Sequence, residues 1–172
     1  MNTYDKILCD MADKMFIQKI ENNILKNFIS TMIYHHEASN LICENIKKYT
    51  QNIDIKSIAD DIIKTQNEEI LNIKKLDANK FLDSIIDIDE YMINYREIIT
   101  TMIFKMYHSP KYENIDLDFI EEIIPHYEGF IFMCENLLKY NIDSNDVCFI
   151  KNIINIYEEK LNKLNTIKET LK

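Results

Sequence analysis

The stretch FISTMIYHHE at residues 28–37 decides the fold, because the chain contains it twice in related form. Ninety-one residues later, at residues 119–128, the chain reads FIEEIIPHYE. Extended without a gap, the alignment pairs residues 4–68 with residues 95–159 and contains 20 identities in 65 positions. Self-similarity at one fixed shift is the signature of a duplicated structural unit. We therefore predict two tandem copies, residues 1–79 and residues 80–172.

Each copy shows three amphipathic helical patterns, with apolar residues three and four positions apart. We predict helices over residues 3–20, 23–49 and 54–76, and again over 80–108, 116–140 and 145–170. The single Gly and two Pro of the chain are too few for β-folds or phosphate-binding loops, which need many turn residues. The sequence thus predicts an all-α protein of six helices, in which two antiparallel three-helix repeats pack face to face as one globular unit.

The turns between these helices carry residues that begin helices well. Asp143, Ser144 and Asn145 are N-cap types before the sixth helix, and Asp116 and Asp118 are expected to play this part before the fifth. Pro125 falls inside the predicted fifth helix, where a proline removes a backbone hydrogen bond. We therefore expect that helix to bend beside His126.

Composition limits the classes of partner and compartment. The net charge of −9, without a dense Lys/Arg cluster, argues against nucleic-acid binding. No stretch approaches a transmembrane span, and the first residues do not form a signal peptide, so we expect no membrane association and a cytoplasmic protein. We therefore expect the four cysteines to be reduced thiols.

A histidine occupies the same inward-facing position in both copies. His35 and His126 lie in equivalent apolar stripes with core spacing. An inward imidazole without a partner costs about 1–3 kcal/mol. Two interpretations remain open. Each histidine is either a structural anchor, bonded to the third helix of its copy, or a metal ligand. Candidate anchor partners are Gln66, Glu68 and Glu69, with Glu159 in the second copy.

The metal interpretation draws on neighbouring soft ligands. Imidazole with thioether sulfur suits Cu(I), and paired methionines recur at equivalent positions. The candidate ligands are His35, His36, Met11, Met15 and Met32 in the first copy and His126, Met102 and Met106 in the second. Methionines at this spacing also fill cores, as buried cysteines such as Cys43 and Cys134 do. Because Tyr127 replaces His36 in the second copy, we expect any complete site in the first.

Catalytic motifs are not found in the sequence. It contains no HExxH motif, no Glu-x-x-His pair of the di-iron kind, and four histidines in all, which is too few for a haemerythrin-type centre. The cysteines lie in apolar stripes, where a thiol is not activated. We therefore expect a protein without enzymatic activity.

The residues around the paired histidines resemble a known family. Met32-Ile33-Tyr34-His35-His36-Glu37-Ala38, followed by Gln66 and Glu69-Ile70, is similar to the pattern of the "domain of unknown function 305" family. Ile124-Pro125-His126-Tyr127-Glu128 repeats part of it in the second copy. The resemblance implies a ferritin-like helical bundle, present here in two tandem copies. Some members look like copper-binding proteins that use His and Met.

Together these observations favour a non-enzymatic, metal-binding helical bundle, with copper as the expected ion. The alternative is a structural or protein-interaction module whose buried histidines hold helices together without metal. A homo-oligomer or a protein partner fits either interpretation.

Overall fold

The computed structural model describes residues 3–17, 19–78 and 85–172, and these residues form six α-helices. The first three are α1 (Thr3–Ile17), α2 (Ile24–Lys47) and α3 (Ile53–Ile73). The others are α4 (Ile85–Tyr107), α5 (Ile115–Leu137) and α6 (Ser144–Leu171). The prediction of an all-α chain with six helices is confirmed. The predicted start of the fourth helix, residues 80–84, lies outside the described residues.

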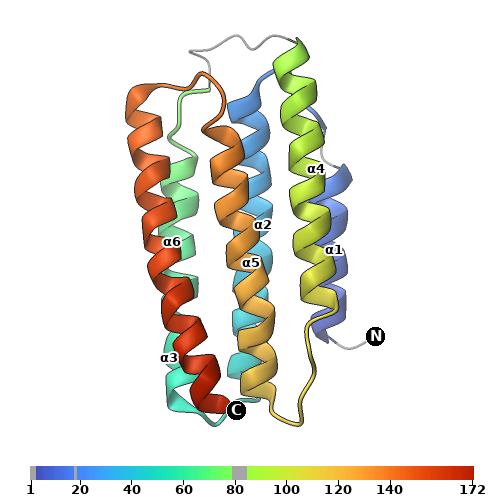
Figure 1. The fold of residues 1–172 in the computed structure, drawn as a ribbon, viewed down its shortest axis with the longest axis vertical. Coiled ribbons are helices and arrows are strands. Elements are labelled where there is room, and N and C mark those ends of the chain that lie inside the picture. Colours follow the sequence, from blue (N-terminus) through green and yellow to red (C-terminus); the bar gives the residue numbers. More distant parts are fainter. Residues whose placement is uncertain (1–2, 18, 79–84) are drawn as a thin grey trace.

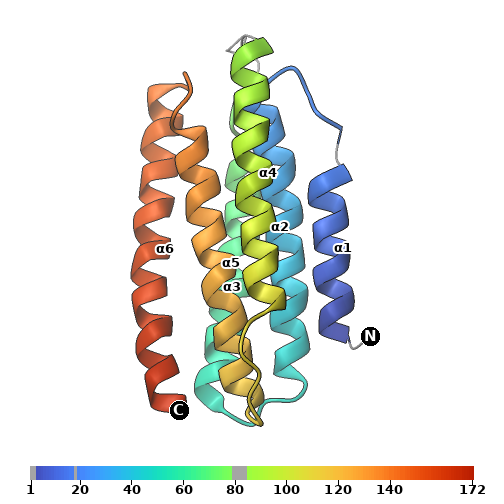
Figure 2. The same ribbon diagram turned by 45° about the vertical axis from the view of Figure 1, so that its right-hand side comes forward.

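The helices form two layers of three, with α1, α2 and α3 in one layer and α4, α5 and α6 in the other (Figure 1). Helices α2 and α5 occupy the middle of their layers and contact each other, and α1 contacts α4 (Figure 2). Followed by colour, α2 and α5 run in opposite directions. Helices that are equivalent in the two sequence copies therefore lie next to each other.

The helix starts follow the sequence repeat. Asn23 caps α2 and Asn114 caps α5, each accepting hydrogen bonds from the first turn with its side-chain oxygen. Asn52 caps α3 and Asp143 caps α6 in the same manner. Each pair is separated by the 91 residues of the repeat. The expectation for Asp143 is confirmed.

The expectation for the cap of α5 needs correction. The cap is Asn114, whereas Asp116 and Asp118 stand in the first turn, where carboxylates favour the positive end of the helix dipole. Pro125 lies inside α5, yet the helix continues to Leu137. The missing N–H removes one backbone bond, and the buried position of Pro125 keeps the neighbouring turns packed in the core.

No helix in the described part of the chain is both long enough and apolar enough to cross a membrane. All four cysteines are free thiols. Cys43 and Cys134 are buried, whereas Cys9 and Cys148 are exposed.

The only glycine of the chain allows α4 to approach α5 closely. A Cβ atom built on Gly129 would lie 2.4 Å from Sδ, 2.6 Å from Cγ and 2.8 Å from Cβ of Met102. The equivalent residues of the first copy are Ala38 and Met11, which line one common pocket wall. Met102 therefore fills the core against a small residue, a packing role for a side chain expected among the metal ligands.

We predict that Gly129→Ala lowers the free energy of unfolding by up to about 2 kcal/mol. Overpacking against Met102 costs about 1–3 kcal/mol, and the better helix propensity of alanine offsets about 1 kcal/mol of it. Urea denaturation of wild type, Gly129→Ala, Met102→Ala and the double variant measures the coupling. The cost should shrink in the Met102→Ala background, and an equal cost in both backgrounds would contradict this packing.

Candidate functional site: a buried histidine cluster

Three imidazoles meet where α2 contacts α5 in the middle of the bundle. The rings of His35 and His126 are stacked, with centroids 3.8 Å apart and planes 8° from parallel. The ring of His36 lies 5.6 Å from that of His35, centroid to centroid, and is tilted by 59°. Because α2 and α5 are antiparallel and both histidines lie near mid-helix, the repeat-equivalent residues face each other.

The cluster is fully buried and rich in unpartnered polar atoms. His35, His36 and His126 each have 0% of their surface exposed. Both nitrogens of His35 and of His126 have no hydrogen-bond partner among the described residues, and neither does the Gln66 amide. Leaving such groups unpaired costs about 1–3 kcal/mol each. Because several such groups lie together, a function of the site has to compensate for their cost in stability.

Burial keeps two of the rings neutral. Removal from water, together with a smaller effect of the nearby His36, lowers the pKa of His126 to about 3. Burial, followed by the neighbouring imidazoles, holds the pKa of His35 well below 6.5. Two neutral rings stack without charge repulsion. The neutral form is also the form in which imidazole binds a metal ion.

The third imidazole is oriented by a carboxylate. His36 Nε2 lies 3.1 Å from Glu69 Oε2, and both side chains are almost completely buried. The hydroxyl of Tyr157 donates a hydrogen bond of 2.7 Å to the same oxygen. This chain runs from α6 through α3 to α2 and leaves Nδ1 of His36 on the other side of the ring. Histidines that bind metals are commonly held in this way by a carboxylate.

Aromatic rings close the cluster on one side. Phe130 lies 5.7 Å from His35 and 5.1 Å from His36, measured between ring centroids. Tyr157 packs 4.2 Å from Phe130 and 4.6 Å from Tyr127. These rings exclude water from the imidazoles and make the surroundings apolar.

The structure separates the predicted site residues into two groups. It brings together His35, His36 and His126, from both copies, so a site confined to the first copy does not describe the arrangement. The predicted methionines Met11, Met15, Met32, Met102 and Met106 are all buried. The Met102 side chain packs against Gly129, and the backbone oxygen of Met15 accepts a hydrogen bond from the Tyr95 hydroxyl at 3.2 Å.

The expected polar partners on the third helices also differ. Glu69 is the acid near the cluster, and it contacts His36 rather than His35. Glu68 and Glu159 are exposed, because each lies on the outer face of its helix. Tyr157 and Phe130 were not predicted. The sequence signal for Phe130 was its place one turn after His126 in the same apolar stripe, and the signal for Tyr157 was that it replaces Gln66 in the second copy.

The side chains as they stand do not form a closed metal site. Among the described residues, no group of three or more His, Cys, Asp and Glu is arranged to hold a metal ion. In a parallel stack the ring nitrogens of His35 and His126 point within two separate planes and do not converge on one ion. Burial also raises the pKa of the Cys43 and Cys134 thiols, which keeps them protonated.

The geometry defines a class of protein, an all-α bundle with a buried polar cluster between its two central helices. Residues 4–77, which are less than half of the chain, match the family described as Domain of unknown function (DUF305), so this part of the chain is similar to that family. The match includes α1, α2 and α3, with His35, His36, Gln66 and Glu69. No curated protein and no solved structure matches the chain.

We predict that acid destabilises the metal-free protein through His126 and His35. Above pH 6.5 both rings are neutral in the folded and unfolded states, so their full contribution is present. As the pH falls, the unfolded histidine binds a proton, whereas folded His126 remains neutral down to about pH 3. Stability should fall by about 2 kcal/mol per histidine between pH 7.5 and 5.0.

Urea denaturation at these two pH values, with a chelator present, measures this loss. His126→Phe should remove one histidine's share of it. His108, which is exposed, provides the control, and His108→Phe should retain the wild-type loss. Equal pH dependence in wild type and His126→Phe would show that His126 is not buried as a neutral ring.

We predict that Tyr157→Phe lowers the free energy of unfolding by about 1.5–3 kcal/mol, because it removes a buried hydrogen bond to a carboxylate. Tyr107→Phe changes an exposed tyrosine and should change stability by less than about 0.5 kcal/mol. Thermal or urea denaturation provides the comparison. A loss for Tyr157→Phe no larger than that for Tyr107→Phe would rule out a role for this bond.

Proposed function

We propose that this protein is a non-enzymatic metal-binding helical bundle. The imidazoles of His35, His36 and His126 are the ligands, and the bound ion is copper-like. The proposal depends on one observation: three fully buried imidazoles lie together. Apart from Nε2 of His36, which contacts Glu69, their nitrogens lack partners among the described residues. A bound cation would satisfy nitrogens that otherwise cost free energy.

Electrostatics supports the same proposal. The low pKa of His35 and of His126 means that neither ring must lose a proton to bind a cation at neutral pH. Glu69 contributes a carboxyl group beside the cluster and holds His36 through Nε2, so the other nitrogen is available. An apolar shell with a few neutral nitrogen ligands suits Cu(I) or Zn(II) better than a hard cation such as Ca²⁺.

Binding requires a local rearrangement of side chains. One ring of the His35–His126 stack has to turn about its χ2 angle, so that its nitrogen leaves the parallel plane and points to a shared position. Met32, one turn before His35 on α2, is the candidate thioether ligand nearest in sequence. Met11, Met15, Met102 and Met106 are further candidates from α1 and α4.

Anaerobic titration of the reduced chain with Cu(I), and separately with Zn(II), against a chromophoric chelator tests the proposal. We predict one ion per chain and a loss of affinity of at least about tenfold for His35→Ala, His36→Ala and His126→Ala, with a loss of about 10–100-fold for Glu69→Gln.

His108→Ala serves as the control for a histidine away from the cluster, and Met32→Leu and Met102→Leu measure thioether ligation. Affinities that are the same in wild type and in all three cluster variants would refute the site.

The His35–His126 stack favours a second candidate, a structural or protein-interaction module without metal. Its near-parallel contact at 3.8 Å stabilises the α2–α5 interface without any ion. In that case His35→Leu lowers the stability of the metal-free protein by about 0.5–1.5 kcal/mol, because the ring stack is lost. If the cluster serves a metal instead, His35→Leu removes unpaired polar atoms and leaves the metal-free stability unchanged or higher.

A further inference from the structure

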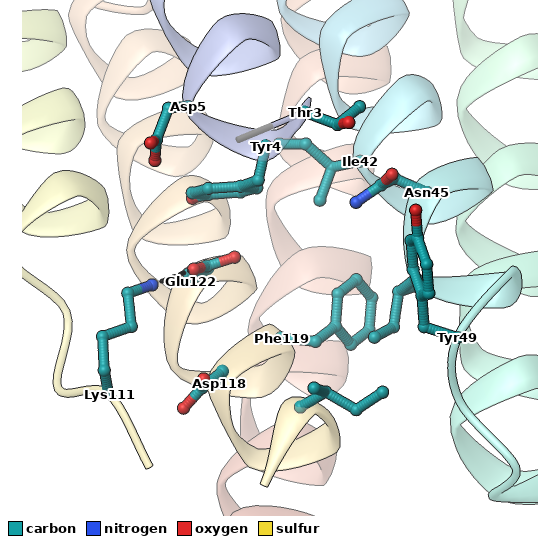
Figure 3. A pocket seen from close by; sticks show the side chains of 12 residues that line it. Thr3, Tyr4, Asp5, Ile42, Asn45, Tyr49, Lys111, Asp118, Phe119 and Glu122 are labelled. Atoms are coloured by element: carbon teal, nitrogen blue, oxygen red, sulfur yellow. Dashed lines mark hydrogen bonds and ion pairs between the residues drawn. The ribbon is translucent and has the colours of Figure 1, made fainter. Parts of the chain in front are cut away.

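A second polar site lies at one end of the bundle, away from the histidines. A pocket of about 340 Å³ opens between the first turn of α1, the last turns of α2 and the first turns of α5. Its volume is at the lower end of the range of about 300–1,000 Å³ for small-molecule sites. Figure 3 shows polar side chains from these helices around it, with Tyr4 and Glu122 on one side and Asn45 and Tyr49 on another.

The polar atoms of this pocket are only partly satisfied. Glu122 is 6% exposed, and its oxygen Oε1 contacts the ammonium group of Lys111. The Tyr4 hydroxyl and Asn45 Oδ1 are buried and have no hydrogen-bond partner among the described residues. Burial raises the pKa of the Tyr4 hydroxyl, and the neighbouring Glu122 contributes to the same shift. Residues with buried, partly satisfied polar atoms therefore line a space large enough for a ligand.

The opposite end of the bundle provides an internal comparison. The equivalent of Tyr4 is Tyr95, whose hydroxyl donates to the Met15 backbone oxygen at 3.2 Å. The equivalent of Asn45 is Asn136, whose amide nitrogen donates to the Tyr91 backbone oxygen at 3.2 Å, while its Oδ1, like that of Asn45, has no hydrogen-bond partner among the described residues. Both are buried, with 2% and 1% of their surface exposed. The same residue types are thus packed at one end and surround a pocket at the other.

The two ends of the bundle also differ in their charged residues. Glu122, Asp118 and Lys111 are replaced in the first copy by Thr31, Asn27 and Ile20, so the charged groups belong to the pocket end alone. The pocket walls contain the carboxyl groups of Asp5, Asp118 and Glu122 against the ammonium of Lys111. An excess of carboxyl groups in a partly desolvated pocket favours a cationic ligand.

Lys111 shows what kind of cation fits. It lies in the connection between α4 and α5, its side chain is 51% exposed, and its ammonium group reaches the nearly buried Glu122 from outside. The same ammonium lies 5.2 Å from the centre of the Tyr4 ring, a cation–π distance. The contact of Lys111 with Oε1 marks the position that an ammonium group takes beside this carboxyl group.

From this arrangement we infer that the pocket binds a small organic molecule with a primary ammonium group on an apolar body. The ammonium group binds Glu122 beside the Tyr4 ring. The apolar body packs against Ile42, Ile46 and Phe119, which line the same pocket. A bare metal ion suits these walls less well, because hard cations need six or more oxygen ligands.

Titration of the isotope-labelled full chain by NMR with 2-phenylethylammonium chloride tests the proposal. The neutral probe 2-phenylethanol and the anionic probe phenylacetate have similar size. We expect the ammonium to bind about tenfold more tightly than the alcohol, with phenylacetate weakest, and with shifts in residues around Tyr4 and Glu122. Equal binding of ammonium and alcohol overturns the proposal, as does the absence of binding.

Matched variants locate the interaction. Glu122→Gln should remove the preference for the ammonium probe. Glu121→Gln removes the same charge from the neighbouring residue, which pairs with Lys168 instead, and should preserve the preference. Lys111→Met changes an exposed connection and should raise the ammonium affinity several-fold by freeing Glu122. An unchanged affinity in Lys111→Met, or equal effects of Glu121→Gln and Glu122→Gln, contradicts the assignment.

Discussion

The contact of His35 with His126 lies where the two central helices meet, and the rest of the bundle is arranged around it. Helices α2 and α5 are antiparallel, so equivalent positions of the two sequence copies face each other only near the middle of the helices. The histidine lies there in both copies. Burial makes the two rings neutral, and neutrality permits stacking at 3.8 Å.

Differences between the sequence copies produce one composite cluster instead of two equal ones. The first copy contributes His36 and Glu69, and the second contributes Tyr157, whose hydroxyl binds that Glu69. Phe130 stands where the first copy has Ser39, and it packs against both first-copy imidazoles. The two ends of the bundle also differ, since the ion pair of Lys111 with Glu122 has no counterpart at the other end.

Hydrophobic periodicity was sufficient to predict the six helices and the inward position of His35 and His126, because burial of one helix face depends on local spacing. It could not predict that these rings touch, since that depends on the direction and offset of α2 against α5. For the same reason the sequence favoured a site in the first copy, whereas the imidazoles that meet come from both copies. Asn114 was overlooked as a cap because Asp116 and Asp118 are equally good cap types.

The direct contact between the two equivalent histidines is the central claim, and a double-mutant cycle tests it most directly. His35→Ala, His126→Ala and the double variant are compared with wild type by urea denaturation of the metal-free protein. Stacked rings in contact predict a coupling free energy of about 0.5–1.5 kcal/mol. Two effects that add to within about 0.3 kcal/mol would show that the rings do not interact.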